Sequence, residues 1–411
     1  MQKLNALDSD MLEPCDAQVQ TSNLWRLMLA QALSGANSVV LYATGAVVGS
    51  LLAPTALLVT LPISIFVLGM ALCVLPAGEL ARKYGRRAAF MAGTGAGVLT
   101  GLLAAIALYV DSFWLYCVSA LLGGAYAAVA LSFRFAATDG VPDNKKPQAL
   151  SMVMAGGVAA GVIGSQLVTH TMHLWSDKMF AATFIAQAVV AAIAGVILFG
   201  VKLAKPLAHQ AYSGRPLTAI ALQPRFISAV ICGAVSYMVM NFLMTSAPLA
   251  MHMHGHSQES ANLGIQWHVI AMYAPSFFTG KLITRFGAAR ISIFGIVLTA
   301  ISAGIGFLGE GVYHFYALLI LLGIGWNFGF LGASALVLET HTPEEKNRTQ
   351  SFNDFIIFGL MAIGSFSSGG LLSAYGWHTV LWASFVPLLL AVVVLIVTKK
   401  YRANFADNSA C

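Results

Sequence analysis

Between two long apolar runs the chain reads Gly78-Glu79-Leu80-Ala81-Arg82-Lys83-Tyr84-Gly85-Arg86-Arg87. A similar string, Gly280-Lys281-Leu282-Ile283-Thr284-Arg285-Phe286-Gly287, lies between two later apolar runs. The first glycines of the two strings are 202 residues apart (280 − 78), close to half of the 411-residue chain. A basic loop bounded by glycines and repeated at half the chain length predicts a membrane protein built from two similar halves.

Two further pairs of strings repeat at nearly the same distance. Ser34-Gly35-Ala36-Asn37-Ser38 resembles Cys232-Gly233-Ala234-Val235-Ser236, an offset of 198 (232 − 34). Val141-Pro142-Asp143-Asn144-Lys145 resembles Thr342-Pro343-Glu344-Glu345-Lys346, an offset of 201 (342 − 141). The agreement of three offsets supports an internal duplication of the whole chain.

The composition is that of a protein that spans a lipid bilayer. Hydrophobic residues make up 58% of the chain and charged residues only 9%, whereas soluble domains carry about 25% charged residues. Apolar runs long enough to cross the hydrocarbon core as helices recur along the sequence. We therefore predict an all-α membrane protein. The net charge of +6 is explained by basic loops on one side of the membrane, so no nucleic-acid partner is expected.

Twelve membrane spans are predicted. They cover residues 24–49, 54–76, 88–110, 113–137, 149–173, 180–201, 226–249, 260–280, 288–309, 315–338, 352–374 and 380–398. The stretch 202–225 is the longest polar break and is the natural linker between the halves. The predicted organisation is a tail (1–23), a first bundle (24–201), this linker, a second bundle (226–398) and a second tail (399–411).

The basic residues are distributed unevenly between the two sides of the membrane. The connections after even-numbered spans and the C-terminal tail carry most of them, and Lys178 is the one that falls in a loop on the other side. Because cytoplasmic loops are enriched in Lys and Arg, both termini are predicted to lie in the cytosol. The five cysteines have no CxxC spacing, so neither a disulfide framework nor a metal site is indicated.

With twelve spans, a central linker and the doubled loop, the chain resembles the major facilitator superfamily. Gly78 to Arg87 is similar to the family's G-x-L-a-D-r-x-G-r-r motif between spans 2 and 3. The resemblance implies two six-helix bundles, related by a pseudo-two-fold axis, that enclose a central cavity and open it alternately to each side. A monomer in the lipid bilayer is expected, without a resident metal or cofactor.

The doubled loop departs from the family motif at one position. The acidic residue that is thought to hold the inward gate shut is replaced by Arg82, and Asp354 stands at the predicted start of span 11. We expect a gate formed by Gly78, Arg82, Gly85, Arg86 and Asp354, in which Arg82 or Arg86 pairs with Asp354. The alternative is that Arg82 only adds to the positive side of the membrane and Asp354 only favours a helix N-terminus.

Polar residues at helical spacing indicate the substrate path. Span 1 offers Gln31, Ser34, Ser38 and Tyr42, and span 7 offers residues at i, i+4 and i+8. Each set shares one face of its helix, which suits a cavity wall, although small polar residues also form interhelical hydrogen bonds. The predicted substrate-binding residues are Gln31, Ser38, Tyr42, Tyr126, Gln166, Tyr237, Asn241, Thr245, Gln266, Trp267, Trp326 and Asn327.

His268 is the candidate for proton coupling. It lies well inside span 8, and histidine side chains titrate near neutral pH. The alternative is a neutral histidine that forms a hydrogen bond to a neighbouring helix.

The outside loop Met251-His252-Met253-His254-Gly255-His256 has side chains that suit zinc or copper, but ordinary polar loops share this composition.

These patterns predict a secondary active transporter of the bacterial inner membrane that moves a small organic solute, with a proton as a candidate coupling ion. The scarcity of intramembrane charge favours a neutral, zwitterionic or planar aromatic substrate, such as a flavin-like vitamin, a siderophore or a hydrophobic drug. No P-loop or nucleophile elbow is present, so neither ATP-driven transport nor an enzyme is indicated. The alternatives are a metal or metal-chelate permease and a non-transporting assembly factor or sensor.

Overall fold

The computed structural model describes residues 2–55, 58–202 and 214–408, and the regular structure of these residues is helical. The elements are α1 (Gln2–Leu52), α2 (Leu61–Tyr84), α3 (Arg86–Tyr109), α4 (Phe113–Leu131), α5 (Phe133–Ala136), η2 (Asp143–Lys145), α6 (Lys146–Thr171), α7 (Ala181–Phe199), α8 (Leu217–Ala221), α9 (Pro224–Met253), α10 (Gln258–Tyr273), α11 (Ser276–Phe286), α12 (Ala288–Ile305), α13 (Val312–Leu338) and α14 (Lys346–Asn408).

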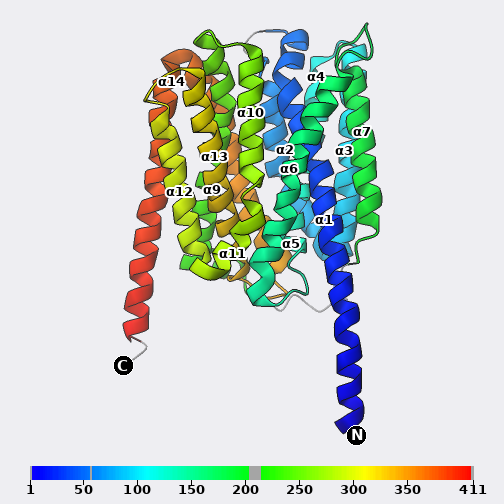
Figure 1. Cartoon of the computed structure of the whole chain (residues 1–411), viewed down its shortest axis with the longest axis vertical. Coiled ribbons are helices and arrows are strands. Elements are labelled where there is room, and N and C mark those ends of the chain that lie inside the picture. The colour runs from blue at the N-terminus through cyan, green and yellow to red at the C-terminus, as the bar shows by residue number, and fades with distance from the viewer. Residues whose placement is uncertain (1, 56–57, 203–213, 409–411) are drawn as a thin grey trace.

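The helices form two bundles that stand side by side (Figure 1). Helices α1 to α7 make one half and α9 to α14 the other, which confirms the prediction of two six-helix bundles. Both termini lie at the same end of the molecule, which we call the termini end. Among the described residues, eleven helical segments are long and apolar enough to cross a membrane.

The eighth predicted span, 260–280, is divided into α10 and α11 and continues to Phe286. The break falls at Ala274 and Pro275. Proline has no N–H for the helical ladder and its ring disfavours a continuous helix, so the backbone turns here. The expectation of one uninterrupted helix is therefore wrong at this span.

The doubled loop is a repeated backbone conformation. Gly85 separates α2 from α3 with φ 89° and ψ 158°, and Gly287 separates α11 from α12 with φ 89° and ψ 145°. A positive φ is accessible to glycine without steric cost. The glycine at the end of each copy therefore lets one helix stop and the next begin without a longer connection.

A third glycine with a positive φ lies close to the junction of the last two spans. Helix α14 has non-helical angles at Gly376, with φ 78° and ψ 177°. The two spans cover Lys346–Leu372 and Ala374–Leu395. The predicted loop between residues 374 and 380 is consequently reduced to a sharp bend.

The predicted tails and linker are partly helical. Helix α1 begins at Gln2 and runs through most of the predicted tail 1–23, while α14 continues to Asn408 within the predicted tail 399–411. The predicted linker 202–225 contains α8 and the start of α9. Residues 1, 203–213 and 409–411 of these segments lie outside the described part of the chain.

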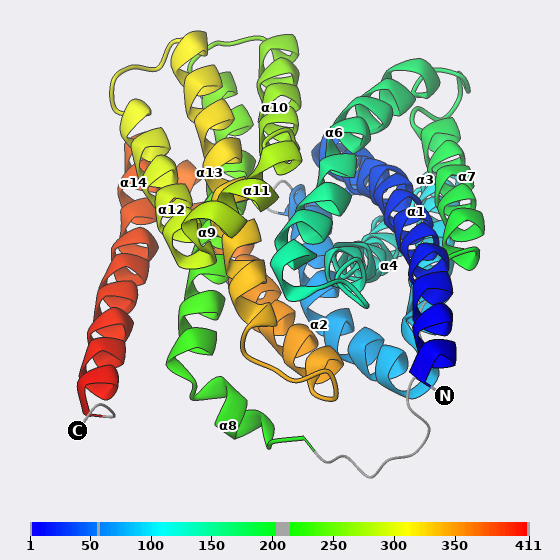
Figure 2. The same cartoon turned by 60° about the horizontal axis from the view of Figure 1, so that its bottom comes forward.

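The two halves meet at the termini end through two helix pairs (Figure 2). Helix α2 packs against α14, and α6 packs against α11. A Cβ atom on Gly78 would lie 1.9 Å from Ser351 Oγ, and one on Gly280 would lie 2.7 Å from Gln148 Cα. The leading glycines of the two similar strings therefore both permit close contact between opposite halves.

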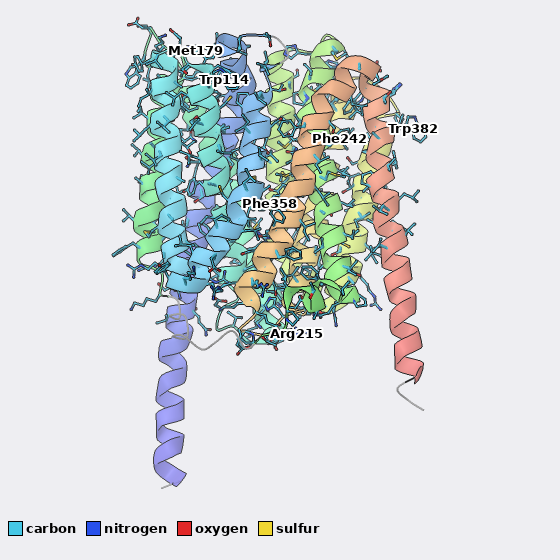
Figure 3. All side chains as sticks on the ribbon, turned by 180° about the vertical axis from the view of Figure 1, so that it is seen from behind. Trp114, Met179, Arg215, Phe242, Phe358 and Trp382 are labelled. Carbon is cyan, nitrogen blue, oxygen red and sulfur yellow. The ribbon has the colours of Figure 1, made fainter. Side chains whose placement is uncertain are left out.

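Large apolar side chains cover the outer flanks of the bundles. Trp114 and Trp382 project from opposite sides near the end away from the termini (Figure 3). Their exposed fractions are 61% and 66%. Exposed tryptophans near the end of a helical bundle are typical of the boundary between lipid and water.

Candidate functional site

A cavity lies between the two halves, away from the termini-end contacts. Its volume is about 690 Å³, part of which is open to solvent. Helices α1, α2, α4 and α6 form one wall, and α9 and α10 form the other. The lining residues are Gln31, Gly35, Ser38, Val39, Tyr42, Phe66, Met70, Ala127, Ala130, Leu131, Ala160, Tyr237, Met240, Asn241, Met244, Val269, Met272 and Tyr273.

The described residues that line this cavity carry no charge. Tyrosine, phenylalanine and methionine give broad apolar surfaces, while a few hydroxyl and amide groups supply hydrogen bonds. Such a wall suits a neutral molecule with a flat apolar face and a few polar groups.

One hydrogen bond crosses the cavity from one half to the other. The Tyr42 hydroxyl on α1 donates to Asn241 Oδ1 on α9 over 3.2 Å. The Tyr42 ring also packs edge-on against Phe66, with the centroids 5.5 Å apart. Tyr42 is therefore held by its own half and orients the amide of the other.

Five of the predicted substrate-binding residues are among those that line the cavity. They are Gln31, Ser38, Tyr42, Tyr237 and Asn241. All five come from spans 1 and 7, where polar side chains recur at helical spacing. The first and seventh spans face each other across the cavity, as the resemblance to a transporter with two halves implied.

Three further predicted residues lie away from this wall. Tyr126 is buried, and its hydroxyl lies 2.7 Å from Ser34 Oγ within the same half. Gln166 is exposed, and Thr245 is partly buried farther along α9. Helical spacing predicts which face of a helix points inward, but it does not predict where along the helix the cavity ends.

The predicted residues of span 8 do not line the cavity. Trp267 is 46% exposed on the outer surface and Gln266 is partly buried. His268 is fully buried, and its Nδ1 lies 2.6 Å from the carbonyl oxygen of Leu319. This contact matches the alternative interpretation of His268 as a histidine that bonds a neighbouring helix.

The two predicted residues of span 10 support the cavity from behind. Trp326 is fully buried and packs edge-on against Tyr237 and Tyr273, at centroid distances of 5.3 and 5.6 Å. Asn327 Nδ2 donates to the Met272 carbonyl oxygen at the break between α10 and α11, over 2.6 Å. Asn327 thus satisfies a backbone group that the interruption at Pro275 leaves unpaired.

Sequence reasoning missed Tyr273 and the methionines of the cavity wall. Tyr273 is the last residue of α10, and its ring lies against Gly157 on the opposite half. A signal was available, since Pro275 disfavours a continuous helix and therefore places Tyr273 near a helix end. Met70, Met240 and Met244 resemble ordinary membrane-span residues and gave no signal.

A buried ion pair joins the halves at the termini end. Arg134 Nη2 on α5 donates to Asp354 Oδ1 on α14 over 2.6 Å, and the two side chains are 0% and 2% exposed. Arg134 also donates to Ser334 Oγ, over 3.2 Å. Its guanidinium lies over the rings of Phe135 and Phe330, at 4.2 and 4.6 Å from the centroids. Both charges are therefore compensated inside the protein.

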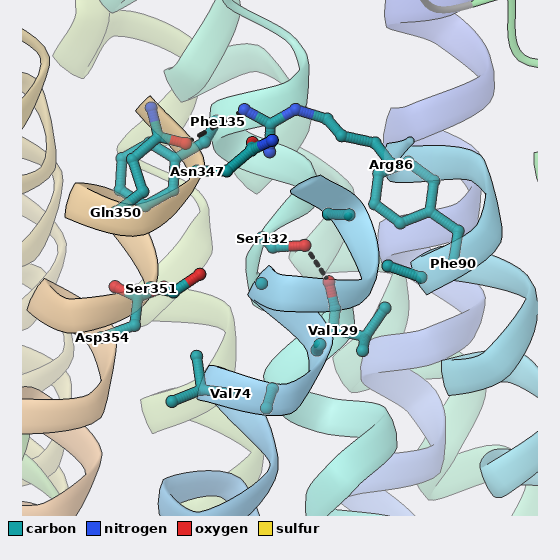
Figure 4. A pocket seen from close by; sticks show the side chains of 15 residues that line it. Val74, Arg86, Phe90, Val129, Ser132, Phe135, Asn347, Gln350, Ser351 and Asp354 are labelled. Carbon is teal, nitrogen blue, oxygen red and sulfur yellow. Dashed lines mark hydrogen bonds between the residues drawn. The ribbon is translucent and has the colours of Figure 1, made fainter. Parts of the chain in front are cut away.

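A second polar layer lies closer to the loops of the termini end. Arg86 Nε donates to Asp139 Oδ2 over 2.8 Å, and Arg86 Nη2 reaches across to Gln350 Oε1 over 3.0 Å (Figure 4). Lys346 Nζ donates to Asp139 Oδ1 over 3.0 Å. Burial alone raises the pKa of Asp139, but Arg86 and Lys346 hold it below its usual range.

The residues of the expected gate lie at the termini end, but their contacts differ from the predicted ones. Asp354 pairs with Arg134, so the predicted pairing with Arg82 or Arg86 is wrong for this conformation. Arg82 instead contacts Glu79 one turn away on the same helix, at 2.6 Å. Gly78 lies at the contact between α2 and α14, and Gly85 supplies the turn that places Arg86.

The histidine loop on the opposite end makes a different set of contacts. His254 Nε2 lies 3.1 Å from Glu310 Oε1, and His378 Nε2 lies 3.8 Å from the same oxygen. Within the described residues, no group of three His, Cys, Asp or Glu side chains has an arrangement that could hold a metal ion.

Comparisons with known proteins agree with this architecture. The sequence model of the Major Facilitator Superfamily matches residues 27–274 and 229–409. The riboflavin transporter RfnT of Brucella anthropi is 46% identical over 397 residues, which cover 95% of this chain and 99% of that protein.

Solved structures show the same fold at low sequence identity. The human organic anion transporter MFSD10 (TETRAN) matches with a TM-score of 0.74 and 12% identity, covering 92% of this chain and 99% of that one. A bacterial homologue of the iron transporter ferroportin in an outward-facing state matches with a TM-score of 0.69 and 15% identity, covering 93% and 99%.

The fold of two helical bundles around a central cavity, the matching family model and the 46% identical relative together show a multi-pass transporter of the inner membrane, not an enzyme. The chain belongs to the Major Facilitator Superfamily. It is a secondary transporter of a small solute.

Proposed function

We propose that the transported solute is riboflavin or a closely similar flavin. The observation that carries the proposal is the uncharged cavity lined by tyrosine, methionine and amide side chains. This cavity belongs to a chain that is 46% identical to a riboflavin transporter over nearly its full length.

Flavin chemistry suits this wall. Riboflavin is neutral, with a flat tricyclic ring and a chain of hydroxyl groups. Aromatic and thioether side chains pack well against flat rings.

We infer that the termini end faces the cytosol. The junction of α2 and α3 lies at this end and carries the basic residues of the doubled string, of which Lys83, Arg86 and Arg87 are examples. Cytoplasmic loops of membrane proteins are enriched in such residues. The conformation is then one in which the cytosolic side is closed by α2 with α14 and by α6 with α11.

The two polar layers serve as the proposed cytosolic gate. Arg134 and Asp354 belong to opposite halves, as do Arg86 and Gln350. Opening the cavity to the cytosol must separate these partners. Each contact therefore favours the closed end, and alternating access requires that the open state replace them with water or other partners.

The gate also supplies the proposed route for a coupling proton. His268 bonds a backbone carbonyl and does not line the cavity. Asp354 loses its cation when the halves separate, and a carboxylate without a nearby cation binds a proton more readily. Asp354 is therefore a better candidate than His268 for a proton that accompanies the solute.

The cavity is complete within one chain, which supports a monomer as the working unit.

The test of the proposed function is riboflavin flux into proteoliposomes that contain the purified protein, with and without a pH gradient. Saturable flux that unlabelled riboflavin inhibits is expected. Protein-free liposomes are the control. Saturable binding without flux would instead indicate a sensor or assembly factor, and absence of both would contradict a flavin substrate.

A further inference from the structure

Two buried amide groups of the cavity wall have unused hydrogen-bonding capacity. Gln31 on α1 and Asn241 on α9 are 2% and 1% exposed, and both line the cavity. Gln31 Oε1 and Asn241 Nδ2 have no hydrogen-bond partner among the described residues. Buried polar atoms are rarely left in this condition, and at a binding site a ligand is one explanation.

The hydrogen bond from Tyr42 fixes the role of Asn241. The Tyr42 hydroxyl donates to Asn241 Oδ1, so the oxygen of this amide is already engaged. The amide N–H groups of Asn241 therefore remain for an acceptor, such as a carbonyl oxygen. Tyr42 acts as a positioning residue for this interaction.

Gln31 offers the complementary group from the opposite half. Its unpartnered atom is an oxygen, which accepts a hydrogen bond from an N–H or O–H group. The cavity thus presents one acceptor from α1 and one donor from α9. The same cavity is lined by aromatic side chains, including Phe66, Tyr237 and Tyr273.

We propose that Gln31 and Asn241 determine specificity by reading a lactam-type edge of a planar heterocycle. The ring N–H would donate to Gln31 Oε1, and a ring carbonyl oxygen would accept from Asn241 Nδ2. This assignment rests on the proposed function, because the pyrimidine part of a flavin carries an N3–H group between two carbonyl groups. Since the two amides belong to different halves, the same edge would contact both bundles at once.

The test compares riboflavin with 3-methylriboflavin, in which the N3–H donor is replaced by a methyl group. Binding to the full-length purified protein is followed by quenching of flavin fluorescence. A site that hydrogen-bonds the N–H rejects an analogue that lacks it, and we expect a preference for riboflavin of about ten- to hundredfold. Gln31→Met should bind riboflavin more weakly, so that its preference for riboflavin over 3-methylriboflavin disappears.

A matched control is available in the same chain. Gln187 on α7 is 1% exposed, its Oε1 is also without a partner among the described residues, and it does not line the cavity. Gln187→Met should keep the wild-type preference. Gln31→Leu provides the same test as Gln31→Met if the latter does not fold.

Asn241 is tested with the same two flavins. Asn241→Leu should weaken the binding of both by a similar factor, about tenfold or more, because both retain the ring carbonyl groups. The control is Asn37→Leu, since Asn37 is also buried (4% exposed), has an unpartnered Oδ1 among the described residues and lies outside the cavity lining.

The outcomes separate this inference from the proposed function. Riboflavin binding with a preference that Gln31→Met leaves intact would overturn the role of Gln31 alone. Unchanged riboflavin binding by Asn241→Leu would overturn the role of Asn241. If the wild-type protein bound neither flavin, the proposed substrate itself would be wrong.

Discussion

The cavity and the termini end are interfaces between the same two halves, but their polar groups differ. At the termini end Arg134, Asp354, Arg86 and Asp139 carry charges that partners of opposite charge compensate. In the cavity, Gln31 and Asn241 are neutral and keep unpartnered atoms. Charged groups whose hydrogen bonds and charges are already matched by partners suit a contact that holds two halves together. Neutral groups with unpartnered donors or acceptors suit the recognition of a solute.

The largest expected effect comes from breaking the buried ion pair. Arg134→Met leaves Asp354 buried without a cation, which costs about 3–5 kcal/mol. We expect a much lower Tm and loss of riboflavin flux. Replacing both residues, as Arg134→Met with Asp354→Leu, should restore most of the thermal stability because no buried charge remains unpaired.

The control for this pair is Arg82→Met. Arg82 and Glu79 are both about half exposed, and exposed ion pairs contribute about 0–1 kcal/mol. The Tm should therefore change little. An Arg134→Met protein as stable as this control would show that the buried pair does not hold the termini end closed.

The next effect tests the close packing between the halves. In Gly280→Val the new Cβ would lie 2.7 Å from both Gln148 Cα and the Pro147 carbonyl oxygen, which are backbone atoms. Overpacking of this kind costs roughly 1–3 kcal/mol, so the closed termini end should become less populated. Spin labels on α6 and α11 would report the longer distance, and flux should fall.

Gly95→Val is the matched control, because a Cβ at Gly95 meets nothing within 4 Å. It should leave both the label distances and the flux near their wild-type values. Equal loss of flux in the two variants would mean that valine in a membrane helix, not contact between the halves, is responsible.

A smaller effect is expected in the cavity. Tyr42→Phe removes the hydrogen bond that holds Asn241 Oδ1. The net contribution of one such bond is about 0.5–1.5 kcal/mol, so the Kd for riboflavin should rise by roughly two- to tenfold. Tyr126→Phe breaks a hydroxyl contact within one half and should leave the Kd unchanged. An unaltered Kd in Tyr42→Phe would argue against its positioning role.

The smallest effect concerns pH at the termini end. Burial lowers the pKa of His341, and its Nε2 lies 3.2 Å from Gln350 Nε2. Because the unfolded histidine binds a proton near its ordinary pKa of about 6.5, stability is full above that pH and declines as pH falls below it. The Tm of the wild-type protein should drop between pH 7 and pH 5, and His341→Gln should drop less. Equal decreases would assign the pH dependence to other groups.

Much of the fold could be predicted from the sequence. Long apolar runs must be helices in a bilayer, because every backbone polar group needs an internal partner. The doubled glycine string predicted the two halves. Its final glycines, Gly85 and Gly287, adopt the same positive φ. The interruption at Pro275 was missed because hydropathy averages over a window and ignores a single residue without an N–H.

The cavity was harder to predict than the fold. On α1 and α9 helical spacing found Tyr42 and Asn241, because polar side chains in a membrane span favour the interior. In span 8 the neighbours Trp267 and His268 face different surroundings, one exposed and one buried. Adjacent residues on a helix point in different directions, so choosing between them requires the tertiary packing.

The pairing of Arg134 with Asp354 could not be predicted from the sequence for a related reason. Arg134 and Asp354 are separated by 220 residues, and Arg86 was an equally plausible partner by charge alone. Which cation reaches the carboxylate depends on how the short helix α5 turns after α4. A single sequence carries no measure of that angle.

The uncharged cavity has an electrical consequence. A membrane potential of 100 mV does about 2.3 kcal/mol of work on an elementary charge that crosses the bilayer. The described cavity lining offers no such charge, and the proposed substrate, riboflavin, brings none. Arg134 and Asp354 together are neutral when paired. Movement of the proposed flavin substrate would therefore be electrically silent by itself, and any current during transport would report the ion that accompanies it.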